Sequence, residues 1–380
     1  MPVCPWRGEW GGPVRVVFCG GGTGGHVYPA LTVAAALRRQ VPDADLLYVG
    51  VRGKLDADLV AREGIPFRGV TAGPLRVGNP IGALRGGLKL LAGVMQSYAI
   101  LRRFRPDVVF ATGGYGSVGV GLAARLRGLP LLVFLPDVAA GFAVKTLTRV
   151  ASRIAVSVPP ALAAMPSSRT QLSGYPVRPQ FFDANRDAAR AHFGLDAVLP
   201  TLLVMGGSTG ASAINRSVAS WVATFLETGQ LIHVCGHNDE GWLQTHRDSL
   251  PPPRRDRYHL HAYLHDDVAQ ALAAAGLAVM RAGASTLGEL PAARLPAILI
   301  PGDFSDQRAN ALFLEHEGAA VMLEQTHLES LPTLIDALLN DKARLVTMRN
   351  ALATLAQPAA ADNLARLITT LAGAKAKVPA

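Results

Sequence analysis

The sequence has few cysteines, few charges and few aromatic side chains. Only three of its 380 residues are cysteines, Cys4, Cys19 and Cys235, and their spacing shows no pairs. An odd, sparse count excludes a disulfide framework and fits a reducing cytosol. Charged residues make up 17% of the chain and hydrophobic residues 49%. This balance excludes intrinsic disorder and predicts a large buried core.

Long uninterrupted apolar runs are also missing. Residues 1–13 lack the apolar centre of a signal peptide. The uncharged stretch 197–215 is broken by glycines, and its pattern is that of a strand, a turn and a helix. We therefore expect a protein without a membrane-spanning segment, either soluble or bound peripherally to a membrane.

The charge is distributed unevenly. The net charge is +9, but residues 1–175 contain 20 basic and 8 acidic side chains, whereas residues 176–380 contain 17 and 20. A basic half can meet nucleic acid, an anionic membrane or a phosphorylated lipid, or can simply keep the protein soluble. Because no stretch interleaves basic with aromatic residues, we expect no nucleic-acid partner.

Apolar runs alternate with alanine- and leucine-rich helical segments, which is typical of an α/β fold with parallel sheets. A linker over residues 174–179, Gly-Tyr-Pro-Val-Arg-Pro, separates two such series. The predicted strands are 14–19, 46–49, 108–111, 131–134 and 154–156 before the linker, and 202–205, 231–234, 258–262, 277–280, 298–300 and 319–322 after it. Two such units imply a cleft, with ligands at the carboxyl ends of the strands.

The most informative segment is residues 20–30, Gly-Gly-Gly-Thr-Gly-Gly-His-Val-Tyr-Pro-Ala, ahead of a helix expected over 31–39. A glycine-dense turn lets backbone N–H groups approach an anion, and a helix N-terminus adds partial positive charge. The segment lacks the Gly-Lys-Ser/Thr of a P-loop. It includes His26, a side chain suited to moving protons near neutral pH. These features predict group transfer on a phosphorylated substrate; the alternative is a tight turn with a structural histidine.

Two further glycine turns follow predicted strands. The second reads Gly113-Gly114-Tyr115-Gly116-Ser117 and the third reads Gly206-Gly207-Ser208-Thr209-Gly210-Ala211. Three occurrences of strand, glycine turn and helix in one chain are improbable by chance. They favour anion binding at the ends of several strands.

Another constellation follows the predicted strand 277–280. Residues 281–289 read Arg-Ala-Gly-Ala-Ser-Thr-Leu-Gly-Glu, a small-residue turn that opens a helix. The N–H groups of residues 284–286 are predicted to hold a diphosphate. Glu289, one helical turn further on, can accept both hydroxyls of a ribose; the alternative is an exposed helix carboxylate. Gln307 and Asn310 share a helical face, and their amides suit sugar hydroxyls.

Residues 73–105 form a basic amphipathic segment. The apolar residues at helical spacing are Ile81, Leu84, Leu88, Leu91 and Met95, and the basic residues among or beside them are Arg76, Arg85, Lys89, Arg102 and Arg103. Such a helix can lie in a membrane interface. The alternative is a core-packed helix whose basic side chains face water.

Histidines alternate along two predicted strand ends. His233, Cys235 and His237 lie on one, and His259 and His261 lie on the other. Alternate strand residues share a face, so a zinc site is conceivable. Because no fourth ligand is placed, we expect no metal and interpret these residues as ordinary core or cleft side chains.

Together these motifs resemble the MurG family, which are family 28 glycosyltransferases of the GT-B fold, from about Val14 to Leu371. The matching segments are Gly21-Gly22-Thr23-Gly24-Gly25-His26, Gly113-Gly114-Tyr115 with Ser117, Gly206-Gly207-Ser208 with Gly210-Ala211 and Ile214-Asn215, and Arg281-Ala282-Gly283 with Glu289, Gln307 and Asn310. Tyr175-Pro176-Val177-Arg178 is similar to the family's Asn-Pro-Val-Arg, with tyrosine for asparagine.

The resemblance implies two Rossmann-like domains with an inter-domain cleft. Residues 1–174 would bind the acceptor and associate with the membrane, and residues 175–357 would bind the UDP-sugar. A helix over about 358–380 would pack back on the N-terminal domain. The enzyme would need no metal or other cofactor. It would be a cytoplasmic protein, peripheral on the cytoplasmic face of the cell membrane.

The resemblance also implies an inverting reaction. N-acetylglucosamine would pass from UDP-N-acetylglucosamine to the 4-hydroxyl of lipid I, undecaprenyl-diphospho-N-acetylmuramoyl-pentapeptide, giving lipid II through a β-1,4 bond. His26 would be the general base. Donor-binding residues would be Arg178, Ser208, Ala284, Ser285, Thr286, Glu289, Gln307 and Asn310. Acceptor-binding residues would be Thr23, Gly24, Gly25, Gly113, Gly114, Tyr115 and Asp137.

The sequence departs from the family in two places, and the larger departure is on the acceptor side. Where the family has His-Glu-Gln-Asn, this chain has Phe134-Leu135-Pro136-Asp137, and Thr209 replaces a glutamine in the third loop. Asp137 alone can substitute for the lost polar groups. One alternative is therefore a related transferase with a different lipid or secondary-metabolite acceptor. Another is a non-catalytic nucleotide-sugar-binding protein, against which the presence of His26 and Glu289 argues.

Overall fold

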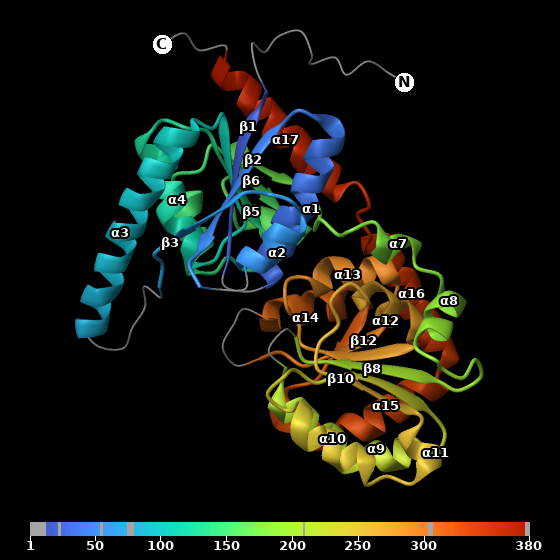
Figure 1. The fold of residues 1–380 in the computed structure, drawn as a ribbon. Coiled ribbons are helices and arrows are strands. Elements are labelled where there is room, and N and C mark those ends of the chain that lie inside the picture. The colour runs from blue at the N-terminus through green and yellow to red at the C-terminus, as the bar shows by residue number, and fades with distance from the viewer. Residues whose placement is uncertain are drawn as a thin grey trace. The chain divides into compact units, whose positions relative to one another are not determined.

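The computed structural model describes residues 13–21, 24–53, 56–73, 80–207, 210–302 and 307–376. The chain forms two compact units (Figure 1). The first contains the residues up to Pro176 together with those from Ala359 onward, and the second is Val177–Pro358. The chain therefore passes between the units twice, once in each direction.

The first unit is built on a seven-stranded parallel sheet in the order β3-β2-β1-β4-β5-β6-β7. Its strands are β1 (Arg15–Cys19), β2 (Asp45–Val51), β3 (Phe67–Val70), β4 (Val108–Ala111), β5 (Leu131–Leu135), β6 (Arg153–Val156) and β7 (Thr170–Leu172). The strand order reverses between β1 and β4. Cys19 pairs with Ala111 across these two strands, so both end at the same level.

Helices cover both faces of this sheet. On one side lie α1 (Gly24–Gln40), α2 (Asp56–Arg62) and α17 (Ala360–Ala376), and on the other lie α3 (Pro80–Phe104), α4 (Tyr115–Leu126) and α5 (Phe142–Thr148) (Figure 1). The short α6 (Pro159–Ala163) and the 3₁₀ turn η1 (Ser167–Arg169) lie between β6 and β7. Because helices cover both sides, residues 16–19 of β1 are fully buried, which explains their continuous apolar run.

The C-terminal helix α17 belongs to the first unit, although it follows the whole second unit in the chain. It packs against α1, β4 and β5. Arg39 of α1 forms an ion pair with Asp362 at 3.1 Å, and Gln40 donates to the carbonyl oxygen of Asp362. The apolar face of α17, which includes Leu364 and Ile368, is completely buried.

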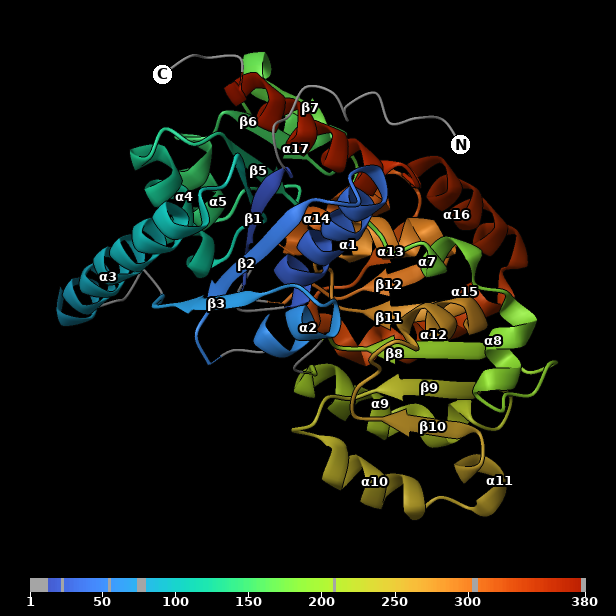
Figure 2. The same cartoon turned by 45° about the horizontal axis from the view of Figure 1, so that its top comes forward.

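The second unit has a six-stranded parallel sheet in the order β10-β9-β8-β11-β12-β13 (Figure 2). Its strands are β8 (Thr201–Met205), β9 (Gln230–Val234), β10 (Tyr258–His261), β11 (Leu277–Met280), β12 (Ala297–Leu299) and β13 (Ala320–Met322). Here the order reverses between β8 and β11. Met280 pairs with Met205 and with Leu299, so the ends of β8, β11 and β12 are level.

The second unit also has helices on both faces. The helices that pack against one another on one face are α7 (Gln180–Asp183), α8 (Arg186–His192), α12 (Val268–Ala274) and α13 (Thr286–Ala293). Helix α9 (Ser212–Phe225), the 3₁₀ segment η2 (Gln325–Ser330) and α15 (Leu331–Asn340) share the other hydrophobic core. The remaining helices are α10 (Glu240–Asp248), α11 (Pro252–Arg255), α14 (Gln307–His316) and α16 (Lys342–Leu355).

The structure corrects three details of the predicted elements. Strands β3 and β7 were not predicted, because Phe-Arg-Gly-Val and Thr-Gln-Leu at the two sheet edges contain no continuous apolar run. Helix α1 begins at Gly24 instead of residue 31, so His26 lies in its first turn. The predicted strand over 258–262 ends one residue earlier, at His261.

Helix α3 has two unlike faces. Gly93 and Leu101 are buried on the face toward α4, where Gly119 allows a close backbone approach. The opposite face exposes a row of apolar side chains: Leu84, Leu88, Leu91, Met95 and Tyr98 are 67%, 59%, 60%, 64% and 37% exposed. The structure therefore supports the amphipathic interpretation over the core-packed one; the side chain of Ile81 lies outside the described residues. Within the described ranges, we find no helix whose length and apolarity together would allow it to cross a bilayer.

Candidate functional site

The first and second glycine loops meet at the point where the strand order of the first unit reverses. They follow β1 and β4, and their glycines allow main chains to touch. Gly113 and Gly114 have φ angles of +100° and +78°. A Cβ at Gly114 would lie 2.2 Å from the carbonyl oxygen of Gly21. Only glycine fits here, because a side chain would meet backbone that cannot move aside. Such a reversal point is where parallel sheets bind ligands.

His26 is fixed between these two loops by a reciprocal pair of hydrogen bonds. Its Nδ1 lies 2.9 Å from the carbonyl oxygen of Thr112, and the Thr112 hydroxyl donates to the carbonyl oxygen of His26 at 2.6 Å. A carbonyl oxygen only accepts, so Nδ1 carries the hydrogen and Nε2 keeps its lone pair. The ring is therefore held in the tautomer that can take a proton through Nε2.

The other predicted acceptor residues follow the ends of neighbouring strands. Tyr115 is the first residue of α4 and is 47% exposed. Asp137 is half-buried in the loop after β5, which adjoins β4 in the sheet. Gly24 and Gly25 form the start of α1, whereas Thr23 lies outside the described residues. The structure thus gathers His26, the second loop and Asp137 along the carboxyl edge of three adjacent strands.

Phe134 and Tyr175, two residues that differ from the family pattern, contact each other in the structure. Phe134, at the end of β5, is fully buried, and its ring packs edge-on against that of Tyr175 with the centroids 6.1 Å apart. Tyr175 itself is only 4% exposed. An apolar aromatic pair thus occupies positions for which the resemblance led us to expect histidine and asparagine.

The predicted donor turn follows β11. Its last residue, Thr286, uses its N–H and its hydroxyl for the carbonyl oxygen of Gly283, at 3.0 and 2.6 Å. Among the described residues, no hydrogen bond uses the N–H of Ala284 or Ser285. The structure therefore narrows the predicted diphosphate cradle to these two N–H groups, because that of Thr286 closes the turn.

Glu289 lies in the first turn of α13, half-buried. Burial raises the pKa of this carboxyl, while a hydrogen bond with Ser285 and the nearby charge of Arg178 act in the opposite direction. Arg178 stacks over Phe181, with its guanidinium carbon 5.3 Å from the ring centroid. The second unit thus brings Glu289, Ser285 and Arg178 together, as the prediction for a ribose and diphosphate site requires.

Gln307 and Asn310 reinforce the loops beside this turn. Asn310 is fully buried and donates its amide to the carbonyl oxygen of Ala282 at 3.0 Å. Gln307 accepts the N–H of Gly302 at 2.8 Å. Arg281, to which the sequence analysis gave no separate role, joins the turns after β11 and β12, because it donates to the carbonyl oxygens of residues 300 and 301. Both amides therefore hold backbone in place, and their contact with a sugar stays a prediction.

A buried polar network supports the third glycine loop, and sequence reasoning did not find it. The Asp239 carboxylate accepts from Ser212 Oγ and Asn215 Nδ2, both at 2.7 Å, and from Trp242 Nε1 at 3.0 Å. Although burial alone raises its pKa, these three hydrogen bonds hold the pKa of Asp239 below its usual value. The network ties the start of α9 to the segment after β9.

The loop itself packs closely against that segment. A Cβ at Gly210 would lie 2.3 Å from the carbonyl oxygen of Cys235, which also accepts from Asn215 at 2.8 Å. Ser208 and Thr209 lie outside the described residues. Asn215 was part of the matched motif, but its partner Asp239 has no sequence signal beyond being one more acidic residue near a turn.

His233 extends the network into the core. Its Nε2 donates to Asn215 Oδ1 at 3.0 Å, and its Nδ1 accepts from the Tyr258 hydroxyl at 2.8 Å. Complete burial lowers the pKa of His233 to about 3, so it stays neutral. Both ring nitrogens are engaged, which leaves none for a zinc ion. Over the described ranges, no three histidine, cysteine or acidic side chains are grouped as metal ligands.

Comparisons with known proteins agree along almost the whole chain. Residues 16–156 match the glycosyltransferase family 28 N-terminal domain, and residues 201–364 match the glycosyltransferase family 28 C-terminal domain. The crystal structure of Acinetobacter baumannii MurG superposes with a TM-score of 0.72 and 28% sequence identity, over 94% of this chain and 100% of that one.

Two curated relatives carry the name UDP-N-acetylglucosamine–N-acetylmuramyl-(pentapeptide) pyrophosphoryl-undecaprenol N-acetylglucosamine transferase. The protein of Roseiflexus sp. (strain RS-1) is 40% identical, with 94% of this chain and 95% of the relative covered. That of Desulforudis audaxviator (strain MP104C) is 38% identical, with 95% and 99% covered.

Proposed function

The chain belongs to glycosyltransferase family 28, and on that basis we propose that it converts lipid I to lipid II in peptidoglycan synthesis. The protein is a glycosyltransferase of the GT-B fold that uses a UDP-sugar. The observation that carries the proposal is the pair of strand-order reversals. One has His26 between two glycine loops, and the other has the third glycine loop beside the turn that leads to Glu289. The relatives' shared name supports N-acetylglucosamine as the transferred group.

In the proposed donor complex, the second unit holds UDP-N-acetylglucosamine. The Glu289 carboxylate accepts the two ribose hydroxyls, and the N–H groups of Ala284 and Ser285 donate to the diphosphate. Arg178 adds positive charge near Glu289, where it can offset the charge that develops on the leaving UDP. This arrangement stabilises the leaving group with backbone dipoles and a guanidinium.

In the proposed acceptor complex, the first unit holds the lipid-linked diphosphate at its two glycine loops. His26 Nε2 takes the proton of the acceptor 4-hydroxyl as the oxygen attacks C1 of N-acetylglucosamine. The bond from C1 to the diphosphate oxygen breaks, and UDP leaves with the electron pair. Attack from the opposite face inverts the anomeric centre and gives a β-1,4 bond.

A related acceptor is the second candidate, and one observation favours it. On the acceptor side, residues 134–137 lack the histidine, glutamate and glutamine of the family's motif, and Phe134 is fully buried. Asp137, at the end of the same segment, is the polar side chain that remains there. An acceptor that makes fewer polar contacts than the muramyl pentapeptide suits this segment, so lipid I and simpler lipid-linked sugars should be compared as acceptors.

We also propose that the first unit binds an anionic membrane surface, on the cytoplasmic face where the lipid-linked acceptor would be reached. The exposed apolar row of α3 is flanked by the exposed basic residues Arg85, Lys89, Arg102 and Arg103. Apolar side chains at the interface, together with basic residues near acidic headgroups, bind a peripheral helix to a membrane.

Replacing His26 tests the proposed mechanism. Loss of a general base typically lowers the rate by about 10²–10⁴-fold, so we expect His26→Ala to lower kcat by that factor. UDP affinity should stay unchanged, because the proposed donor residues belong to the other unit. His316→Ala is the matched control, since this histidine is exposed on the second unit. A kcat of His26→Ala within about threefold of the wild-type value would remove His26 from the base role.

A further inference from the structure

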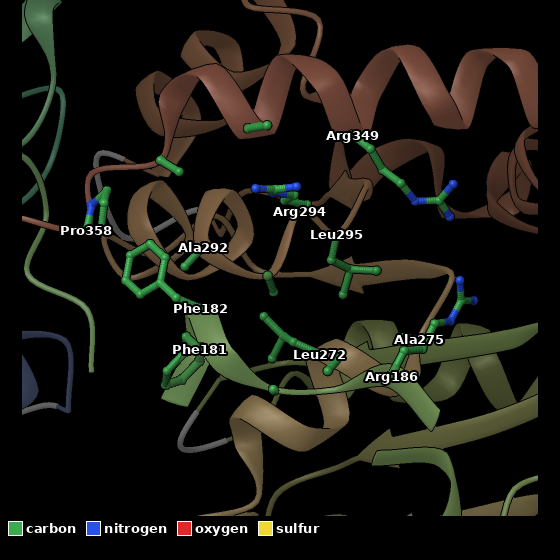
Figure 3. A pocket seen from close by; sticks show the side chains of 15 residues that line it. Phe181, Phe182, Arg186, Leu272, Ala275, Ala292, Arg294, Leu295, Arg349 and Pro358 are labelled. Carbon is green, nitrogen blue, oxygen red and sulfur yellow. The ribbon is translucent and has the colours of Figure 1, made fainter. Parts of the chain in front are cut away.

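The second unit contains a cavity of about 650 Å³ that lies away from the proposed donor site (Figure 3). Its lining includes Ala275 and Leu295, which precede β11 and β12. The donor turn and the loop at residues 300–302 follow the carboxyl ends of the same two strands. The cavity is therefore at the amino edge of the sheet, opposite to the glycine loops. Its volume is within the range of about 300–1,000 Å³ that is usual for small-molecule sites.

The side chains that line the cavity are of two kinds, apolar ones and arginines. Phe181, Phe182, Leu272 and Leu295 line it together with several alanines. The polar side chains among its described lining residues are all arginines: Arg186, Arg294 and Arg349. None of the lining residues is acidic, and none is an uncharged hydrogen-bonding side chain. The side chains that line the cavity thus offer a ligand either positive charge or apolar surface.

Two of the arginines approach one another at one end of the cavity. Figure 3 shows Arg186 of α8 and Arg349 of α16 with their side chains turned toward each other. Both reach the same backbone: Arg349 donates to the carbonyl oxygen of Gly276 at 3.4 Å, and a Cβ at Gly276 would lie 3.5 Å from Arg186 Nη2. Burial and the charges of Arg190 and Arg349 lower the pKa of Arg186, whereas the nearby Asp187 acts in the opposite direction.

The neighbouring Arg190 shows what a structural arginine looks like in this region. Its guanidinium donates to the carbonyl oxygens of Ala197, Leu199 and Ala274. Arg349 makes one such bond, to the carbonyl oxygen of Gly276. In contrast, no hydrogen bond or ion pair within the described part of the chain involves the guanidinium of Arg186 or Arg294. Two adjacent guanidinium groups without a carboxylate between them match a shared anion.

We propose that this cavity binds an amphiphilic anion, whose phosphate or carboxylate head pairs with Arg186 and Arg349. Its apolar body lies along Phe182, Leu272 and Leu295. This lining suits an amphiphile better than a nucleotide or a sugar, because arginine is the only polar side chain in it that could pair with a base or a hydroxyl group. The site is therefore different in ligand class from the UDP-sugar site.

Calorimetric titration of the full-length protein with octyl phosphate and octanoate tests this proposal, in saturating UDP so that the donor site is occupied. Octanol and inorganic phosphate are titrated beside them. We expect one mole of octyl phosphate or octanoate to bind per chain, and neither octanol nor phosphate to bind as tightly. Comparing the two anions shows whether a phosphate or a carboxylate head is preferred. Equal affinity for octanol would contradict the role of the arginines, and equal affinity for inorganic phosphate would contradict that of the apolar walls.

Two variants locate the binding. Arg186→Gln/Arg349→Gln should weaken octyl phosphate binding by roughly tenfold or more, because charge-assisted hydrogen bonds are lost. Ala353→Phe fills the cavity without changing the charge and should abolish binding. The control is Arg344→Gln, which removes a charge from an exposed position of α16, the helix that carries Arg349 and Ala353. Arg344 does not line the cavity, so this variant should bind octyl phosphate like the wild type. Unchanged binding by both cavity variants, with unchanged UDP affinity, would overturn the proposal and place the amphiphile elsewhere, for instance on the leucine row of α3.

Discussion

At the scale of single residues, the structure specifies the tautomer that the neutral ring of His26 adopts. The carbonyl oxygen of Thr112 fixes the hydrogen on Nδ1, and Thr112 in turn holds the His26 backbone through its own hydroxyl. A base that is already in the correct tautomer and orientation needs no rearrangement before proton transfer. Thr112 directly precedes the second glycine turn, but nothing in that position alone predicts a contact with a residue 86 positions earlier.

Glu289→Gln should separate binding from stability. Loss of charge-assisted hydrogen bonds to the ribose should weaken UDP binding by roughly tenfold to a hundredfold. The folded protein should not lose stability at neutral pH. Because burial raises the pKa of Glu289, its contribution to stability is present at low pH and is lost as the pH rises through the folded-state pKa. Glutamine is neutral at every pH and avoids that loss.

Calorimetry with UDP and thermal melting between pH 4 and 8 check both parts. The wild type should bind UDP more tightly as Glu289 ionises with rising pH, whereas the variant should lack this dependence. Glu329→Gln is the control, since this residue is exposed in the second unit. If Glu289→Gln binds UDP like the wild type, the carboxylate does not hold the ribose.

At the scale of elements, each glycine loop depends on a partner segment distant in the chain. The third loop leads into α9, whose first turn is held by Asp239, 24 residues after Asn215. Asp239→Asn leaves a neutral amide among three donors. We expect it to destabilise the fold by about 1–3 kcal/mol and to weaken UDP binding, because each unsatisfied buried donor is costly and the loop becomes less ordered.

Urea unfolding and UDP calorimetry measure the two effects. Asp248→Asn is the matched control. This carboxylate lies at the end of α10, the helix that follows Asp239, and it is exposed, with contacts only to Gln244 and Arg247 of its own helix among the described residues. If Asp239→Asn loses stability but keeps wild-type UDP affinity, the network stabilises the unit without positioning the donor loop.

Helix α3 carries a prediction about membranes. Leu88→Ser/Leu91→Ser removes part of its exposed apolar row and should reduce sedimentation with anionic vesicles. Added salt should weaken the binding of the wild type, since each basic residue near an acidic surface contributes about 1 kcal/mol. Val346→Ser is the control, an exposed apolar residue of the second unit. If the variant sediments with anionic vesicles as well as the wild type does, the apolar row of α3 has no role in binding. If the wild type sediments equally with anionic and neutral vesicles, its basic residues have none.

At the scale of the whole molecule, the sequence predicts every strand of the second sheet and the central strands of the first, but it misses the two edge strands of the first sheet. Strands that are covered on both faces, such as β1 and β8, appear as continuous apolar runs, and glycine turns mark their carboxyl ends. The edge strands β3 and β7 are held mainly by pairing with one neighbour, so their sequences carry little signal. The residues that support the site, Thr112 and Asp239, act through contacts that exist only after folding.

Transfer of radiolabelled N-acetylglucosamine from UDP-N-acetylglucosamine to a lipid I analogue tests the central claim most directly. The account predicts a β-1,4-linked disaccharide on the lipid and release of UDP in equal amounts. Both should require His26, because its Nε2 takes the proton of the acceptor hydroxyl as the oxygen attacks. Release of UDP without a labelled lipid product, or transfer at an undiminished rate by His26→Ala, would contradict the account.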